Sequence, residues 1–221
     1  MAILKAENVH YTYSGKYQKV HAVKGISYDF EEGKLYAIVG KSGCGKTTFL
    51  SMLSGLDLPT DGEVTYGGVN TKTLNRDRYR RERVALICQS FNLFPLLTVL
   101  ENVMYPMRLR GIKEHEAKAL AAEKLSDVGI GEDYFKRLPA MLSGGEQQRI
   151  AIARALGSNA RIILADEPTG NLDTENGDNI LAILSRLAHE QGYCVIVVTH
   201  DMSIAARADE VVRLKDGVVV G

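Results

Sequence analysis

The spacing of apolar residues along the chain predicts alternating strands and helices. Apolar residues recur at helical spacing from Ile180 to Ala188, and Gly192 follows as a stop signal. Strands that alternate with helices are typical of a mostly parallel sheet, so the pattern predicts an α/β fold. Continuous apolar runs typical of buried strands stand at 35–39, 84–88, 161–165 and 194–198.

Shorter strand-like runs near both ends of the chain predict antiparallel pairing. Residues 2–9 and 20–30 are separated by a turn at Ser14-Gly15-Lys16, and 62–68 form another short strand. We expect these three to form an antiparallel β layer against the core. A terminal hairpin is predicted at 211–214 and 218–220, around the turn Lys215-Asp216-Gly217.

The middle of the chain differs from both flanks because its pattern is mostly helical. Apolar positions from Glu114 to Val128 and from Ile150 to Leu156 fit helices that end at Gly129 and Gly157. We therefore predict one domain, 1–221, in which a helical subdomain at 90–155 is inserted into an α/β core formed by 1–89 and 156–221.

Composition narrows the possible partners. Among 221 residues, 27 Lys and Arg balance 27 Asp and Glu, so bulk charge favours neither nucleic acid nor an anionic membrane. The arginine-rich run 75–83 also contains acids, and a solvated helix face explains it better than a nucleic-acid patch. No apolar run reaches the roughly 18 residues that span a bilayer.

Three cysteines, Cys44, Cys88 and Cys194, lie far apart without metal-ligand spacing. We expect reduced thiols, as in a cytosolic protein. Cys44 stands at a predicted helix start beside Lys46, where a thiol can be acidified and reactive. A small residue tolerated in the loop is the simpler interpretation.

Candidate chemistry begins with Gly40-Lys41-Ser42-Gly43-Cys44-Gly45-Lys46-Thr47, between the strand at 35–39 and a helix pattern through Leu53. In such a loop, glycines let backbone N–H groups turn toward phosphate oxygens. Lys46 adds a positive charge and the Thr47 hydroxyl is suited to Mg²⁺. The helix that starts there adds its positive dipole end. The sequence therefore predicts a nucleotide phosphate site.

Two acids, Asp166 and Glu167, end the strand at 161–165. Beside a phosphate loop, Asp166 suits an outer-shell role toward Mg²⁺ and Glu167 is free to polarise an attacking water. A plain strand-end turn before Pro168 is the alternative.

The segment Leu142-Ser143-Gly144-Gly145-Glu146-Gln147-Gln148-Arg149 precedes a helix. Ser143 and Glu146 fit a capping box. Two glycines in a first helical turn each cost about 1 kcal/mol relative to alanine, and a cap does not require them. We interpret Gly144 and Gly145 as positions of close backbone approach, with a second phosphate as the natural neighbour.

This last segment resembles the signature sequence of ATP-binding cassette (ABC) ATPases, and the rest of that family's motifs occur in order. Gly40 to Thr47 resembles Walker A, Gln89 the Q-loop, Ile162 to Glu167 Walker B, 171–173 the D-loop and His200 the switch histidine. The resemblance covers essentially the whole chain. The segments 91–103 and 165–173 are most similar to the lipoprotein-release and macrolide-exporter group.

The resemblance implies a P-loop fold and a Mg²⁺-dependent ATPase. It implies catalytic roles for Glu167, His200, Lys46 and Gln89, and Mg²⁺ ligation by Thr47, Gln89 and Asp166. Tyr13 would stack on adenine, with Tyr11 as the alternative. The other residues implied to bind ATP are Gly40, Ser42, Gly43, Cys44, Gly45, Thr48, Ser143, Gly144, Gly145 and Asp173.

The resemblance also implies partners. Two copies would sandwich two ATP molecules head to tail, with Ser143 and Gly145 of one chain closing the site of the other, while Asp173 and Asn171 communicate across the dimer. A groove near Phe91 to Tyr105 would receive a separate membrane permease at the cytoplasmic face. A soluble, non-transport cassette ATPase is the alternative. A regulatory GTPase is disfavoured because no Asn-Lys-x-Asp string occurs.

Overall fold

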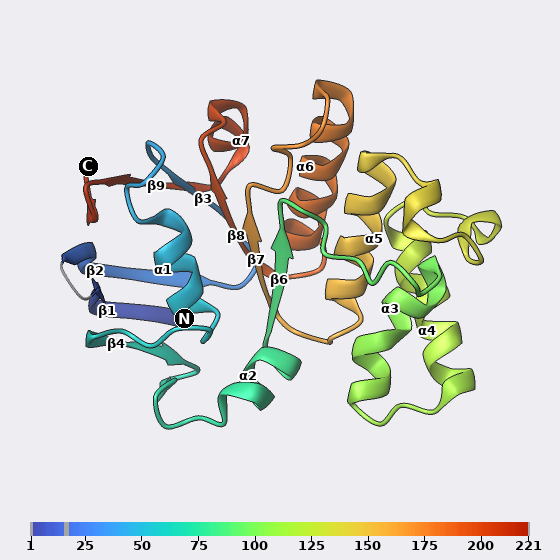
Figure 1. Ribbon diagram of the computed structural model, residues 1–221, viewed down its shortest axis with the longest axis horizontal. Coiled ribbons are helices and arrows are strands. Elements are labelled where there is room, and N and C mark those ends of the chain that lie inside the picture. The colour runs from blue at the N-terminus through green and yellow to red at the C-terminus, as the bar shows by residue number, and fades with distance from the viewer. Residues whose placement is uncertain (1, 16–17, 221) are drawn as a thin grey trace.

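Six strands form the central sheet, in the order β10-β9-β3-β8-β7-β6 (Figure 1). The computed structural model describes residues 2–15 and 18–220. Neighbouring strands pair in parallel except β10 with β9, so the predicted mostly parallel sheet is confirmed. The strands are β3 (Leu35–Val39), β6 (Val84–Cys88), β7 (Ile162–Asp166), β8 (Cys194–Thr199), β9 (Glu210–Lys215) and β10 (Val218–Val219).

A second, antiparallel sheet has the order β2-β1-β4-β5. Two of its strands are longer than the sequence pattern predicts, since β1 covers Ala2–Ser14 and β2 covers Lys19–Glu31. They are followed by β4 (Asp61–Tyr66) and β5 (Val69–Asn70). The predicted antiparallel layer is therefore confirmed. Lys16, the last residue of the turn predicted between β1 and β2, lies outside the described residues.

Side-chain caps define several helix starts. Thr98 and Ser143 each form a capping box with the glutamate three residues on, and Asn75 and Asp173 accept from backbone N–H groups of the first turn. Within the described residues no helix is long and apolar enough to cross a membrane. The helices are α1 (Lys46–Leu53), α2 (Arg76–Glu82), α3 (Val99–Leu109), α4 (Glu114–Asp127), α5 (Gly144–Leu156), α6 (Thr174–His189) and α7 (Met202–Arg207), with 3₁₀ turns at Glu132–Tyr134 and Pro139–Met141.

The two faces of the central sheet bury alternate residues of each strand. On β7, Ile163 and Ala165 belong to a core shared with α3 to α6, whereas Ile162 and Leu164 pack with α1 and the antiparallel sheet. Each fully buried aliphatic side chain contributes about 1.5–3 kcal/mol. Both faces are thus covered, which explains why these strands read as continuous apolar runs.

The segment between β6 and β7 holds α3, α4 and α5, which lie to one side of the sheet (Figure 1). Their buried residues, among them Val103, Ala121 and Ile150, form one continuous cluster with the sheet face. The helical character predicted for this stretch is present, and the helices pack directly on the strands that end at the candidate site.

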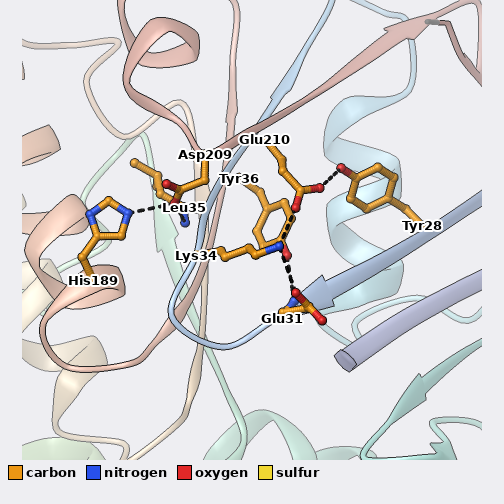
Figure 2. Close-up of polar contacts among 8 residues, drawn as sticks. All are labelled: Tyr28, Glu31, Lys34, Leu35, Tyr36, His189, Asp209 and Glu210. Atoms are coloured by element: carbon orange, nitrogen blue, oxygen red, sulfur yellow. Dashed lines mark hydrogen bonds and ion pairs between the residues drawn. The ribbon is translucent and has the colours of Figure 1, made fainter. Parts of the chain in front are cut away.

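An ion-pair cluster joins the two sheets at the amino end of β3 (Figure 2). The glycine loop follows the other end of the same strand. Lys34 Nζ lies 2.8 Å from Glu210 Oε1 and 2.9 Å from Glu31 Oε2, and the Tyr28 hydroxyl donates to Glu210 Oε2 at 2.6 Å. The hydrogen bonds from Lys34 and then Tyr28 lower the pKa of Glu210. The cluster therefore connects β2, the turn before β3, and β9.

A second contact at this end of β3 anchors the end of α6. Asp209 Oδ2 accepts from Leu35 N at 2.7 Å and lies 2.8 Å from His189 Nε2 (Figure 2). Burial acts to raise the pKa of Asp209, but the bonds from Leu35 and His189 outweigh it, and the net shift is downward. Asp209, which precedes β9, therefore links Leu35 at the start of β3 to His189 at the end of α6.

We predict that Glu210→Gln lowers the melting temperature by a few degrees at neutral pH. A depressed carboxyl pKa contributes stability above the unfolded-state pKa, and this stability is lost as pH falls through the folded-state pKa. The difference between wild type and variant should therefore shrink in acid. Thermal scans from pH 3 to 7 measure it, with the exposed Glu32→Gln as control. A pH-independent difference would contradict the prediction.

Candidate active site

The loop between β3 and α1 wraps around the ammonium of Lys46. Lys46 Nζ donates to Gly40 O at 2.8 Å and to Lys41 O at 3.3 Å, and the residue is only 7% exposed. The loop therefore curls around a positive charge at the N-terminus of α1, where the helix dipole is also positive. Such an arrangement is suited to bind an anion.

Gly45 is required by both its conformation and its surroundings. Its φ is +104°, which disfavours any other residue, and a Cβ there would lie 2.3 Å from the carbonyl oxygen of Ala22. Strand β2 therefore lies directly against the glycine loop. No sequence signal pointed to Ala22, because the contact joins two different sheets.

Asp166, the last residue of β7, lies against the start of α1. Thr47 Oγ1 donates to Asp166 Oδ1 at 3.3 Å. Burial raises the pKa of Asp166, and the hydrogen bond from Thr47 opposes that shift. A hydroxyl and a carboxylate at this separation are the hard oxygen ligands that suit Mg²⁺.

Glu167 adopts a strained backbone conformation with a φ of +48°. Its N–H donates to Val198 O at 2.8 Å, and its carboxylate lies 2.9 Å from His200 Nδ1 and 3.3 Å from Thr199 Oγ1. The carboxylate is 18% exposed, so it is held between β7 and β8 with limited access to solvent. Thr199, fully buried, is a positioning contact that sequence reasoning missed.

These groups line one cleft of about 860 Å³, within the usual range for ligand pockets. Of the predicted site residues, it brings together Tyr13, Ser42, Gly43, Gly45, Lys46, Thr47, Thr48, Gln89, Asp166, Glu167 and His200. Gly40 and Cys44 line an adjoining hollow instead. Lining residues that sequence reasoning missed are Val20, His21, Ala22, Lys24 and Asp216.

The structure distinguishes the two candidate tyrosines. Tyr13 is 48% exposed, lines the cleft, and its hydroxyl lies 3.1 Å from Thr48 Oγ1. Tyr11 packs instead on the core beneath the antiparallel sheet, with its ring edge-on to that of Tyr13. Of the two tyrosines, therefore, Tyr13 is the one that lines the cleft. Cys44 is 7% exposed, which favours the interpretation as a small loop residue.

Gln89 reaches the cleft from the end of β6 and is held by the turn after β7. Its Nε2 donates to Asn171 Oδ1 at 3.3 Å, while Asn171 Nδ2 donates to the backbone oxygen of Gln89 at 3.0 Å. The predicted Q-loop and D-loop residues are therefore in direct contact within one chain.

The predicted signature residues do not line this cleft. Ser143 is exposed and caps α5, where its side chain accepts from Glu146 N at 3.3 Å. A Cβ on Gly144 would lie 3.3 Å from Leu172 Cδ2, and one on Gly145 would lie 2.2 Å from Asn176 Oδ1. Leu172 and Asn176 of the same chain therefore already account for glycine at positions 144 and 145, which we had ascribed to close approach of a second phosphate.

The fold and this cleft define a nucleotide-binding protein of the P-loop class, because a glycine loop joins a parallel strand to a helix beside a second strand that ends in two acids. Comparison with known proteins narrows the class. The family model described as ABC transporter matches residues 23–170. The chain belongs to the ABC transporter family.

Relatives and solved structures agree with this assignment. An uncharacterized ABC transporter ATP-binding protein of Mycobacterium tuberculosis is 42% identical over 97% of this chain and 88% of its own length. The cassette MJ0796 of Methanocaldococcus jannaschii is 42% identical over 98% of this chain and 95% of its own. Its dimeric structure superposes with a TM-score of 0.90 at 40% identity, covering 99% and 97% of the two chains.

Two further similarities concern function. A second dimeric structure of MJ0796, described as a post-hydrolysis state bound to ADP and Pi, has a TM-score of 0.90 at 39% identity and covers 99% of this chain and 97% of the other. The macrolide export ATP-binding/permease protein MacB of Neisseria gonorrhoeae is 40% identical over all of this chain, which spans 34% of MacB.

We predict that Gly145→Ala destabilises the protein by about 1–2 kcal/mol, because overpacking against Asn176 outweighs the helix propensity gained by alanine. Urea unfolding measures it. Adding Asn176→Ala to the Gly145→Ala variant should restore part of the lost stability. The two substitutions should therefore show a favourable coupling energy.

The matched control is Gly177→Ala, one turn into α6. Its Cβ would lie 3.6 Å from the nearest neighbouring atom, in Thr169, so we expect no loss or a small gain of stability. Equal effects of Gly145→Ala and Gly177→Ala would contradict the packing argument.

Proposed function

We propose that the chain is the ATP-binding and ATP-hydrolysing subunit of an ABC transporter, which drives a separate membrane permease in export, lipoprotein release or mechanical signalling. One observation carries the proposal: Lys46, Thr47 and Asp166 lie in one cleft with the Glu167–His200 pair. This arrangement offers a phosphate cradle, metal-suited oxygens and a water-activating carboxylate together. ATP and water would yield ADP and phosphate.

ATP binding in this cleft follows from its lining. Backbone N–H groups of the loop, together with Lys46 and the hydroxyls of Thr47 and Thr48, would hold the phosphates. Tyr13 would stack on adenine, since it is the tyrosine that lines the cleft. Ser42, Gly43 and Gly45 complete the cradle, whereas Gly40 and Cys44 would support its shape.

The oxygen atoms near the loop fit Mg²⁺. The Thr47 hydroxyl, the Asp166 carboxylate and the oxygen of the Gln89 side-chain amide are hard ligands from residues that line the cleft. When bound, the ion would neutralise phosphate charge. The Thr47 hydroxyl and the Asp166 carboxylate would hold each other in position through the hydrogen bond between them.

Glu167 is our candidate for the group that activates water. Its contacts with His200 and Thr199 limit the rotation of the carboxylate, which is what a positioned general base requires. His200 is 71% exposed and would also contact the terminal phosphate. The strained backbone of Glu167 supports a functional role, because such conformations cluster at active sites.

The site would be completed by a second copy. Ser143, Gly144 and Gly145 lie outside the cleft of their own chain, although Ser143 is exposed at a helix N-terminus suited to phosphate. The related MJ0796 cassette forms dimers. We therefore propose a head-to-tail dimer around two ATP molecules, in which Ser143 and Gly145 close the partner's site and Asp173 and Asn171 lie at the interface.

The surface from Phe91 to Tyr105 is our candidate for permease docking at the cytoplasmic face of the membrane. Leu96 is 88% exposed, and the rings of Phe94 and Tyr105 lie 4.5 Å apart at an adjacent hollow. Buried Asn102 fixes this loop through bonds to Phe94, Leu97 and Thr98. A rigid, apolar, exposed loop is suited to receive a partner helix.

We further propose that 90–155 forms a helical signature subdomain inserted into an α/β core of 1–89 and 156–221. The separation of Ser143 and Gly145 from the cleft supports this division.

Balanced net charge gives no support for a nucleic-acid partner.

We predict that Glu167→Gln retains ATP binding, loses turnover by at least a hundredfold and accumulates an ATP-bound dimer. The amide keeps the size of the side chain but cannot accept the proton of the attacking water. Phosphate release and light scattering measure the two effects, with the exposed Glu175→Gln of α6 as control. Hydrolysis at the wild-type rate would exclude Glu167 as the activating group.

Ser143→Arg should prevent formation of the ATP dimer in a Glu167→Gln background while single chains still bind ATP. The long cation would occupy the space that the partner's phosphates need. Ser143→Ala is the control, since both variants lose the α5 cap, at about 1 kcal/mol. Size-exclusion chromatography with light scattering measures the dimer. An unimpaired dimer in the arginine variant would contradict the shared site.

A further inference from the structure

The amide pair between Gln89 and Asn171 joins two segments that lie 82 residues apart in sequence. One hydrogen bond runs from the Gln89 side chain to Asn171, and the other runs from the Asn171 side chain back to the Gln89 main chain. The first bond fixes the orientation of the Gln89 amide. The second fixes the position of the strand end from which the side chain extends.

The turn after β7 provides space for this pair. A Cβ on Gly170 would lie 2.7 Å from Gln89 Nε2 and 3.3 Å from its Cδ. Only a glycine therefore allows the Gln89 amide to lie against the turn. This spatial requirement is an observation independent of the hydrogen bonds.

The chain beyond Gln89 is fixed from another direction. Phe91 and Asn92 both adopt left-handed conformations, with φ of +57° and +51°. Arg154 on α5 donates to their carbonyl oxygens, at 3.0 Å to Phe91 and 2.5 Å to Asn92. Burial lowers the pKa of Arg154, which still bonds both carbonyls. The segment therefore has little freedom, and among the described residues Asn171 is the one that hydrogen-bonds the Gln89 side-chain amide.

We propose that Asn171 is a positioning residue for Gln89. By accepting from Nε2, it leaves Oε1 as the amide atom that is available to a cation in the cleft. Among residues 2–15 and 18–220 no hydrogen bond uses Gln89 Oε1, although Gln89 lines the cleft. Without Asn171, the amide would be free to rotate and present Nε2, a donor that repels a cation. The proposal rests on the proposed function, which supplies Mg²⁺ as that cation.

Calorimetry with the β,γ-imido analogue of ATP tests the proposal. The dissociation constant is measured with Mg²⁺ and with a chelator, and their ratio reports how much the cation contributes. We expect Asn171→Ala to reduce this ratio about three- to tenfold, the contribution of one oriented hydrogen bond. The control Asn179→Ala, an exposed residue of α6, should match wild type.

Two further variants separate orientation from general damage. Asn171→Asp keeps an oxygen acceptor for Nε2, and although it loses the Nδ2 donor, its added negative charge favours a cation, so its ratio should be at least that of wild type. Gly170→Ala should lower the ratio by displacing the amide. A wild-type ratio in both Asn171→Ala and Gly170→Ala would overturn the proposal, and so would an aspartate variant that behaves like alanine. Loss of analogue binding by wild type in both conditions would instead refute the proposed function.

A readout without nucleotide or metal completes the test. In ¹⁵N spectra of the free protein, the Gln89 side-chain amide protons should exchange with water more slowly in wild type than in Asn171→Ala. Equal exchange rates would show that the hydrogen bond does not hold in solution and would overturn the proposal independently of the binding data.

Discussion

The hydrogen-bonded register of three adjacent parallel strands is the constraint on which the rest of the structure depends. In this ladder Val39 of β3 faces Thr199 of β8, and Asp166 of β7 faces Val198. Because parallel strands end at the same edge, the glycine loop, the paired acids and the Thr199–His200 segment emerge side by side. Strand spacing of about 4.8 Å then sets how far apart these groups lie. A slip in this register would separate the phosphate cradle from its acids.

The antiparallel sheet supports the glycine loop directly, through strand β2. Ala22 of β2 contacts Gly45, and Lys24 N donates to Gly217 O at 2.8 Å. Gly217 N in turn donates to Cys44 O at 3.1 Å, which ties the C-terminal hairpin to the loop. The cradle is thus supported by β2 and by the C-terminal hairpin. Preorganised donors of this kind need no rearrangement when charge develops, and electrostatic catalysis depends on that property.

Local patterns were sufficient to predict the architecture, the loop and the acids, since strands, helix caps and glycine spacing are properties of neighbouring residues. Contacts between distant segments were not predictable. Thr199 and Ala22 carry no local signal, and the clash that excludes a side chain at Gly145 arises from Asn176 on another helix. Helix α3 lies within the stretch predicted to be mostly helical but was not predicted as a separate element, and it contains Pro106, against the usual rule. Tyr11 and Tyr13 became distinguishable only once the strand was seen to direct one ring to the cleft.

The left-handed backbone of Glu167 has a consequence for protein engineering. Glycine at this position would relieve the strain at φ +48°, but it would also remove the contacts of the carboxylate with His200 and Thr199. A search for stabilising substitutions that scores backbone strain alone would therefore select against the residue that we propose as the activator of water.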